Sequence, residues 1–328
     1  MKRANRILAA FLVVLLLIFT LASCGKSKSS EDDLRTVMTI DGFEVPYEQF
    51  RYFFMNYKAQ FEPDEGELSA SEKKQKEAEL DSAVVGALRG VYAVLALCRD
   101  YGIDPDDKSI QNEVKTKIDE TIDSYGGEKK YKSALEKNYM NESVYGFLLA
   151  VDLCEAELYD KMIDSGKIDA SDDAASASIN GEDFIRTIQI LIRNDAGDDI
   201  EQNRKTANEL LARIKNGEDF DTLIGRYSED LSMTPDGYYS THLELLEEYE
   251  KTAYALGIGE ISEVVESSAG FHIIKRLSKE SDYITRHFDE LKTKYLTSAF
   301  YTIIENKKSE LKVTKNSLYE SFNVDNVS

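Results

Sequence analysis

The chain has 328 residues, which at the usual domain size corresponds to about two domains. Its formal net charge of −21 argues against a nucleic-acid partner, because contacts to phosphates need an excess of lysine and arginine. The histidines (His242, His272 and His287) are scattered and no glycine loop of the phosphate-binding kind is present, so the sequence predicts neither a metal site nor a nucleotide site.

The N-terminus has the pattern of a secretory signal. A basic head of Lys2, Arg3 and Arg6 precedes an uncharged run from Ile7 to Phe19, which is shorter than the roughly 20 apolar residues of a spanning helix. The Leu-Ala-Ser-Cys that ends at Cys24 resembles the lipobox of bacterial lipoproteins. In that family the thiol is diacylated and the chain is cut just before the cysteine.

The lipobox resemblance implies a signal peptide over residues 1–23, lipid on Cys24 and a polar tether over 24–35. The protein is then expected on the extracytoplasmic face of the cell membrane, anchored by lipid. Its formal charge becomes −24, since the removed segment carries three basic and no acidic residues (−21 − 3). The alternative is an uncleaved N-terminal anchor with a chance cysteine.

Residues 36–164 are predicted to form a helical domain. It begins with two alternating runs around Asp41-Gly42, a pattern typical of a β-hairpin. Apolar residues then recur at helical spacing, and Asp104-Pro105 predicts one helix start as cap and first residue. Cys98 and Cys154 fall within these apolar patterns, so we expect buried free thiols rather than a disulfide.

Residues 165–183 are rich in Ser, Ala and Asp and are predicted to be a linker. After them come a strand over Phe184–Ile192, three helices, and strand-like runs over Ile261–Val265 and Phe271–Arg276. This order predicts a small α/β domain over 184–278. Residues 279–328 carry a long amphipathic helix, which we expect to fold back onto the first domain because its apolar stripe needs a partner.

Three segments of the α/β domain resemble the parvulin class of peptidyl-prolyl isomerases. Asn216–Asp230 is similar to the family's Gly-x-x-Phe-x-x-Leu and Tyr-Ser-x-Asp, Glu247–Ser262 to its Phe-x-x-Ala-x-x-Leu-x-x-Gly-Glu-Ile-Ser, and Ser267–Leu277 to its Gly-Tyr-His-Ile-Ile. The flanking regions resemble PrsA- and SurA-type foldases, which build a helical chaperone domain from both chain ends around the parvulin domain. The implied fold class is α+β: a helical SurA/PrsA-like domain with an inserted parvulin α/β domain.

The resemblance also implies a site. The catalytic positions of the family fall on Asp230, His272, Gln189 and Ser267. The proline pocket falls on Leu245 and Tyr249, with Tyr239 at its edge. No cofactor is implied, because rotating an X-Pro amide over its barrier of about 20 kcal/mol makes and breaks no covalent bond. Taken singly, each of these residues also has an ordinary structural explanation, and only their joint spacing carries the prediction.

Two departures from the family pattern bear on activity. Gln189 stands where the family has its first histidine, and Asp236–Ser240 replaces a Gly-Gly-Asp-Leu-Gly loop. Glutamine can hydrogen-bond but cannot take a proton, so weakened rather than abolished isomerisation is expected. Two functions stay open: a membrane-tethered isomerase and foldase for unfolded or newly exported polypeptides with X-Pro bonds, or a non-catalytic chaperone for such chains. A structural lipoprotein without clients is a third.

Overall fold

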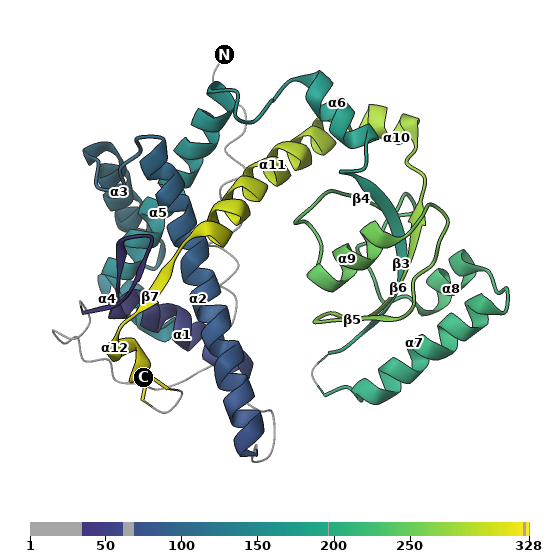
Figure 1. The fold of residues 1–328 in the computed structure, drawn as a ribbon, viewed down its shortest axis with the longest axis horizontal. Coiled ribbons are helices and arrows are strands. Elements are labelled where there is room, and N and C mark those ends of the chain that lie inside the picture. The colour runs from purple at the N-terminus through teal and green to yellow at the C-terminus, as the bar shows by residue number, and fades with distance from the viewer. Residues whose placement is uncertain (1–34, 62–68, 196, 324–325, 328) are drawn as a thin grey trace. The chain divides into compact units, whose positions relative to one another are not determined.

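The chain forms two compact units in a computed structural model that describes residues 35–61, 69–195, 197–323 and 326–327. One unit takes in Met1–Ser165 and Ile303–Ser328, and the other takes in Gly166–Thr302 (Figure 1). The first unit is therefore built from both ends of the chain, with the second inserted between them, as predicted. The predicted signal peptide, Cys24 and the tether up to residue 34 lie outside the described residues.

A small antiparallel sheet joins the two ends of the first unit. The predicted hairpin is confirmed as β1 (Thr36–Ile40) and β2 (Phe43–Pro46), and Asp41 and Gly42 have φ of 49° and 84°, as a tight two-residue turn requires. The C-terminal strand β7 (Val313–Lys315) pairs with β1 and gives the order β2-β1-β7. This pairing closes the unit, and the sequence analysis did not predict it.

Helices make up most of the first unit: α1 (Tyr47–Phe61), α2 (Ala70–Asp100), α3 (Lys108–Ser124), α4 (Glu128–Lys137), α5 (Glu142–Asp164) and the short α12 (Ser317–Glu320). Among the described residues, α2 is the helix long and apolar enough to cross a membrane, but 56% of its apolar window is buried, as in a core helix. Cys98 of α2 and Cys154 of α5 are buried and free, which confirms that prediction.

The predicted helix start at Asp104-Pro105 is wrong. α3 begins at Lys108, and Asp107 caps it by accepting a hydrogen bond from the Ser109 N–H at 2.8 Å. Asp104 lies in a turn, where its carbonyl accepts from the Asp107 N–H at 3.0 Å. Aspartate and proline also favour turns, so the dipeptide alone does not distinguish the two.

The second unit is a four-stranded antiparallel sheet of order β4-β3-β6-β5 between helices. Its strands are β3 (Ile185–Arg193), β4 (Tyr238–Ser240), β5 (Val265–Ser267) and β6 (Gly270–Leu277). α7 (Ile200–Lys215) and α8 (Phe220–Tyr227) pack on one face through Ile188, Ile190 and Ile192, while α9 (Glu247–Ala255) covers the other face (Figure 1).

The prediction of a linker over 165–183 is wrong. The segment contains α6 (Asp172–Asn180), whose Ala175 and Ile179 are fully buried against Phe184 and Leu291. Because a short helix needs only a few apolar side chains to dock, its polar composition concealed it. The unit therefore begins near Gly166 rather than at 184.

The strand predictions at the end of the α/β domain need correction in one place. β6 agrees with the predicted Phe271–Arg276, but Ile261–Val265 is not a strand, since Ile261 makes an isolated bridge to Lys275 and β5 starts only at Val265. β4 was not predicted. Strands of three residues carry almost no periodicity, so they are recognised only by their pairing.

The predicted fold-back of the C-terminal helix is correct for its end but not for its start. After the short α10 (Ser281–Arg286), α11 (Phe288–Glu310) begins in the second unit, where Leu291 is buried. Its last turns belong to the first unit, where Lys307 pairs with Asp100 at 2.9 Å and the Ser309 carbonyl accepts from Arg89 at 3.0 Å.

Candidate active site

The register of β3 and β6 brings Gln189 and His272 together. Gln189 is opposite Ile274, and Leu191 is opposite His272, so Gln189 and His272 are diagonal neighbours on adjacent strands. Side chains alternate between the faces of a strand, so both lie on the face opposite to the isoleucines that contact α7 and α8. The sheet thus places the two predicted residues on one face.

Asp230 reaches the same place through the segment that follows α8. β4 pairs with β3 only as far as Thr187, and beyond it this segment runs along the free edge of β3. The Glu229 N–H donates to the Leu191 carbonyl at 2.9 Å, and the Leu191 N–H donates to Ser228 Oγ at 3.2 Å. These bonds fix Asp230 beside Gln189.

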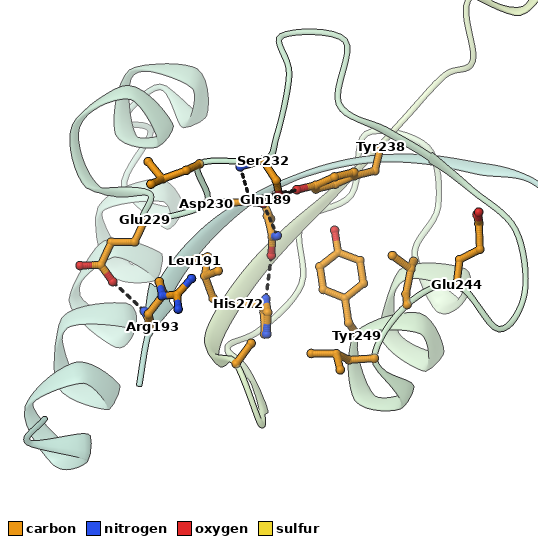
Figure 2. A pocket seen from close by; sticks show the side chains of 14 residues that line it. Gln189, Leu191, Arg193, Glu229, Asp230, Ser232, Tyr238, Glu244, Tyr249 and His272 are labelled. Atoms are coloured by element: carbon orange, nitrogen blue, oxygen red, sulfur yellow. Dashed lines mark hydrogen bonds between the residues drawn. The ribbon is translucent and has the colours of Figure 1, made fainter. Parts of the chain in front are cut away.

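The four predicted catalytic side chains form one hydrogen-bonded row. Gln189 Nε2 donates to Asp230 Oδ2 at 2.6 Å, and Gln189 Oε1 lies 2.7 Å from His272 Nδ1 (Figure 2). Since the amide oxygen only accepts, Nδ1 carries the proton, and the bare Nε2 of neutral His272 accepts from Ser267 Oγ at 2.6 Å. Each residue of the row therefore donates its hydrogen bond to the next one in the direction of Asp230.

Asp230 accepts further hydrogen bonds from its own loop. The Tyr238 hydroxyl lies 2.9 and 2.8 Å from its two oxygens, and Ser232 Oγ lies 2.7 Å from Oδ1. The backbone N–H groups of Ser232 and Met233 also donate to Oδ1, at 3.1 and 3.2 Å. The carboxylate is thus held in one orientation with its charge well compensated.

An apolar wall of α9 and the loop before it completes the site. Leu245 packs beside Tyr249, whose ring meets His272 edge-on with centroids 5.4 Å apart. The Tyr249 hydroxyl donates to Thr187 Oγ1 at 3.0 Å, so its ring is fixed. Figure 2 shows Gln189 between Asp230 and His272, and the Tyr249 ring beside His272. The cavity of about 440 Å³ is lined by Gln189, Leu191, Arg193, Glu229, Asp230, Leu231, Ser232, Tyr238, Glu244, Leu245, Leu246, Tyr249, Ala269 and His272.

The placement of Tyr239 at the edge of the pocket is wrong. Tyr239 is buried in a different cluster, with Ala175, Ile284 and Leu291, and stacks on Tyr283 at 3.9 Å. Its neighbour Tyr238 lines the cavity instead, because successive residues of β4 point to opposite sides. The two tyrosines can be distinguished only from the pairing of β4 with β3, which the sequence did not predict.

The protonation states of the row are fixed by its surroundings. Burial raises the pKa of Asp230, but hydrogen bonds from Ser232, Tyr238 and Gln189 outweigh burial and leave that pKa below its ordinary value. Burial lowers the pKa of His272, and the negative charges of Asp230 and Glu248 only partly oppose this. At neutral pH the row therefore holds a carboxylate and a neutral imidazole.

We expect the free energy of unfolding to decrease as the pH is lowered below about 6.5, the range in which a free histidine takes up a proton. Because burial lowers the pKa of His272 in the folded state, the unfolded chain binds the proton first, so stability is lost as the pH falls toward the folded pKa. The slope from this residue is at most about 1.4 kcal/mol per pH unit. Thermal midpoints between pH 5 and 8 should depend less on pH in His272→Asn than in the parent. Parallel curves would contradict the prediction.

Comparison with known proteins assigns a family to each part of the chain. Residues 189–278 match the family described as Rotamase: PPIC-type PPIASE domain, and residues 1–159 match the SurA-like N-terminal domain. The chain combines a SurA-like N-terminal domain with a parvulin-type peptidyl-prolyl isomerase domain. The predicted fold class is thereby confirmed, and the row from Ser267 to Asp230 lies in or beside the isomerase domain's sheet.

Relatives and solved structures resemble the chain over different lengths. It is 29% identical to foldase protein PrsA 3 of Bacillus cereus over 197 residues, which is 57% of this chain and 59% of the relative. It is 25% identical to foldase protein PrsA of Caldanaerobacter subterraneus over 297 residues, 88% and 86% of the two chains. The structure of peptidylprolyl isomerase PrsA from Bacillus anthracis is 18% identical, covers 68% of this chain and 96% of its own, and has a TM-score of 0.36. The first of these alignments spans about three fifths of the relative's length.

Proposed function

We propose that this protein is a peptidyl-prolyl cis-trans isomerase and foldase that acts outside the cytoplasm on unfolded or newly exported polypeptides containing X-Pro bonds. The single observation that carries the proposal is the row Ser267–His272–Gln189–Asp230 beside the apolar wall of Leu245 and Tyr249. The signal-like N-terminus and Cys24 support membrane attachment by lipid.

The two walls of the cavity match the two needs of amide rotation. Rotation requires a slot that holds the prolyl ring and polar groups that favour the twisted amide over the planar one. Leu245 and Tyr249 supply the slot, and the fixed carboxylate of Asp230 supplies a charge in the same cavity. Since no proton passes to the substrate, a glutamine at position 189 can support the reaction by orienting its neighbours.

A second candidate is a chaperone that binds client chains without catalysing rotation. The observation that favours it is the saturation of Asp230, whose oxygens accept from Gln189, Tyr238, Ser232 and the Met233 backbone. A carboxylate with this many donors has less remaining capacity to act on a substrate amide.

A prolyl isomerase assay separates the two candidates. The soluble chain from residue 25 onward is mixed with peptides that differ in the residue before proline, and its suppression of client aggregation is measured in parallel. A rate above the uncatalysed one supports the isomerase. Suppressed aggregation without any rate supports the non-catalytic chaperone instead.

Gln189→His should raise kcat/KM by roughly threefold to tenfold, the effect of improving one hydrogen bond. An imidazole can still bridge Asp230 and His272, and it can also carry a positive charge beside the carboxylate. Gln189→Leu is the matched variant for the opposite effect: it removes both hydrogen bonds of the amide and should lower kcat/KM. Equal rates for parent and Gln189→His would show that this position hardly matters.

A further inference from the structure

Two leucines line the candidate active site without being part of any core. Leu231 directly follows Asp230 and is 97% exposed, and Leu246 at the start of α9 is 42% exposed. Single exposed leucines are ordinary on protein surfaces. Two of them on separate segments line one cavity, so the site itself carries exposed apolar surface.

The backbone that carries Leu231 is already ordered. Asp230 Oδ1 accepts from the N–H groups of Ser232 and Met233, so it closes a turn around Leu231 and leaves its side chain outside. The same carboxylate is held by Gln189. Contact between Leu231 and a ligand would therefore cost little backbone entropy.

The loop that carries Leu246 is fixed from within α9. The Glu250 N–H donates to the Leu246 carbonyl at 2.8 Å, and Glu250 Oε2 accepts from the Leu243 N–H at 2.9 Å. Leu243 has φ of 67°, a region that leucine rarely adopts, so the loop is held in a specific conformation. The adjacent Leu245 packs inward against Tyr249, which leaves Leu246 at the rim.

We propose that Leu231 and Leu246 contact an apolar side chain next to the prolyl residue, and that X-Pro segments with an apolar neighbour are the preferred substrates. This inference rests on the proposed isomerase function. Three carboxylates (Glu229, Asp230 and Glu244) and one cation (Arg193) line the same cavity, and this net negative charge disfavours an acidic neighbour there. Large apolar side chains are mostly buried in folded proteins, so segments of this kind are more accessible in unfolded chains.

The proposal is tested with two sets of matched peptides. One set has Leu, Ser or Glu before proline, and the other has these residues after it. In the chain from residue 25 onward, the leucine peptide should exceed the serine peptide in kcat/KM by roughly five- to tenfold at one of the two positions, the effect of partly burying one leucine. The glutamate peptide should be slowest. Leu231→Ser and Leu246→Ser should each reduce this ratio severalfold.

Ile258→Ser is the matched control, since Ile258 is 71% exposed and is not among the residues that line the cavity. It should leave the ratio unchanged. Fluorescence anisotropy of the same labelled peptides gives the ratio of dissociation constants, so the leucines are tested even in a protein without catalysis. Absence of any rate would contradict the proposed function alone. Equal leucine-to-serine ratios in parent and Leu231→Ser, at both positions and in binding, would overturn the role of the leucines.

Discussion

Asp230→Ala should reduce kcat/KM for prolyl peptides by on the order of 100-fold or more, the usual effect of removing one preorganised electrostatic group. The substitution removes the charge of the row and the acceptor for Gln189, Tyr238 and Ser232. Gln189 then has no partner that holds its amide oxygen toward His272. A protease-coupled or direct isomerase assay measures the loss.

Two further variants show whether charge or shape is responsible for this loss. Asp230→Asn keeps the shape, but one of its two positions becomes a donor that cannot accept from Gln189 or Tyr238, so a large loss is again expected. Asp221→Ala removes an exposed carboxylate of α8 that does not line the cavity and should leave the rate unchanged. Full activity of Asp230→Ala would exclude this site as the catalytic one.

Gly270→Ala should destabilise the second unit by about 3 kcal/mol or more through combined steric overlap and backbone strain. A Cβ at this position would lie 2.1 Å from the Ile192 carbonyl oxygen and 2.8 Å from Arg193 Cα, and φ is 136°. Backbone cannot yield as a flexible side chain can, so β3 and β6 must separate. Gln189 on β3 and His272 on β6 should then move apart, which weakens the row.

The matched control is Gly259→Ala, where φ is also positive, at 87°, but nothing lies within 4 Å of the added Cβ. It should cost only about 1 kcal/mol, the strain of a left-handed L residue. Thermal unfolding together with hydrogen exchange of the β3 and β6 amides measures both variants. Equal destabilisation by the two would show that the contact with Ile192 does not matter.

Local patterns predicted the long elements because their causes are local. The hairpin at Asp41-Gly42 depends on a turn that these two residues adopt readily. α5 begins after Asn141, which caps it by accepting from the Val144 N–H at 2.8 Å. α6 escaped prediction because its stability comes from docking Ala175 and Ile179 rather than from a pronounced apolar stripe.

For the candidate site, the family resemblance singled out Gln189, Asp230, Ser267 and His272, and the structure joins all four in one hydrogen-bonded row. The sequence did not indicate Ser232 or Tyr238, which hold Asp230. Ser232 lies in an irregular loop and Tyr238 in a strand of three residues, and neither has a recognisable pattern. The error at Tyr239 has the same origin, since a one-residue change of position on a strand reverses the side chain.

By itself the sequence determined the hairpin, the long amphipathic helices and the main strands, because periodicity and turn residues act within a few residues. The isomerase domain was indicated by its family motifs. Only the tertiary structure decided that β7 completes the sheet of the first unit, and that Leu231 and Leu246 line the same cavity. These features join residues far apart in the chain. Their formation depends on pairing and packing that a local pattern does not encode.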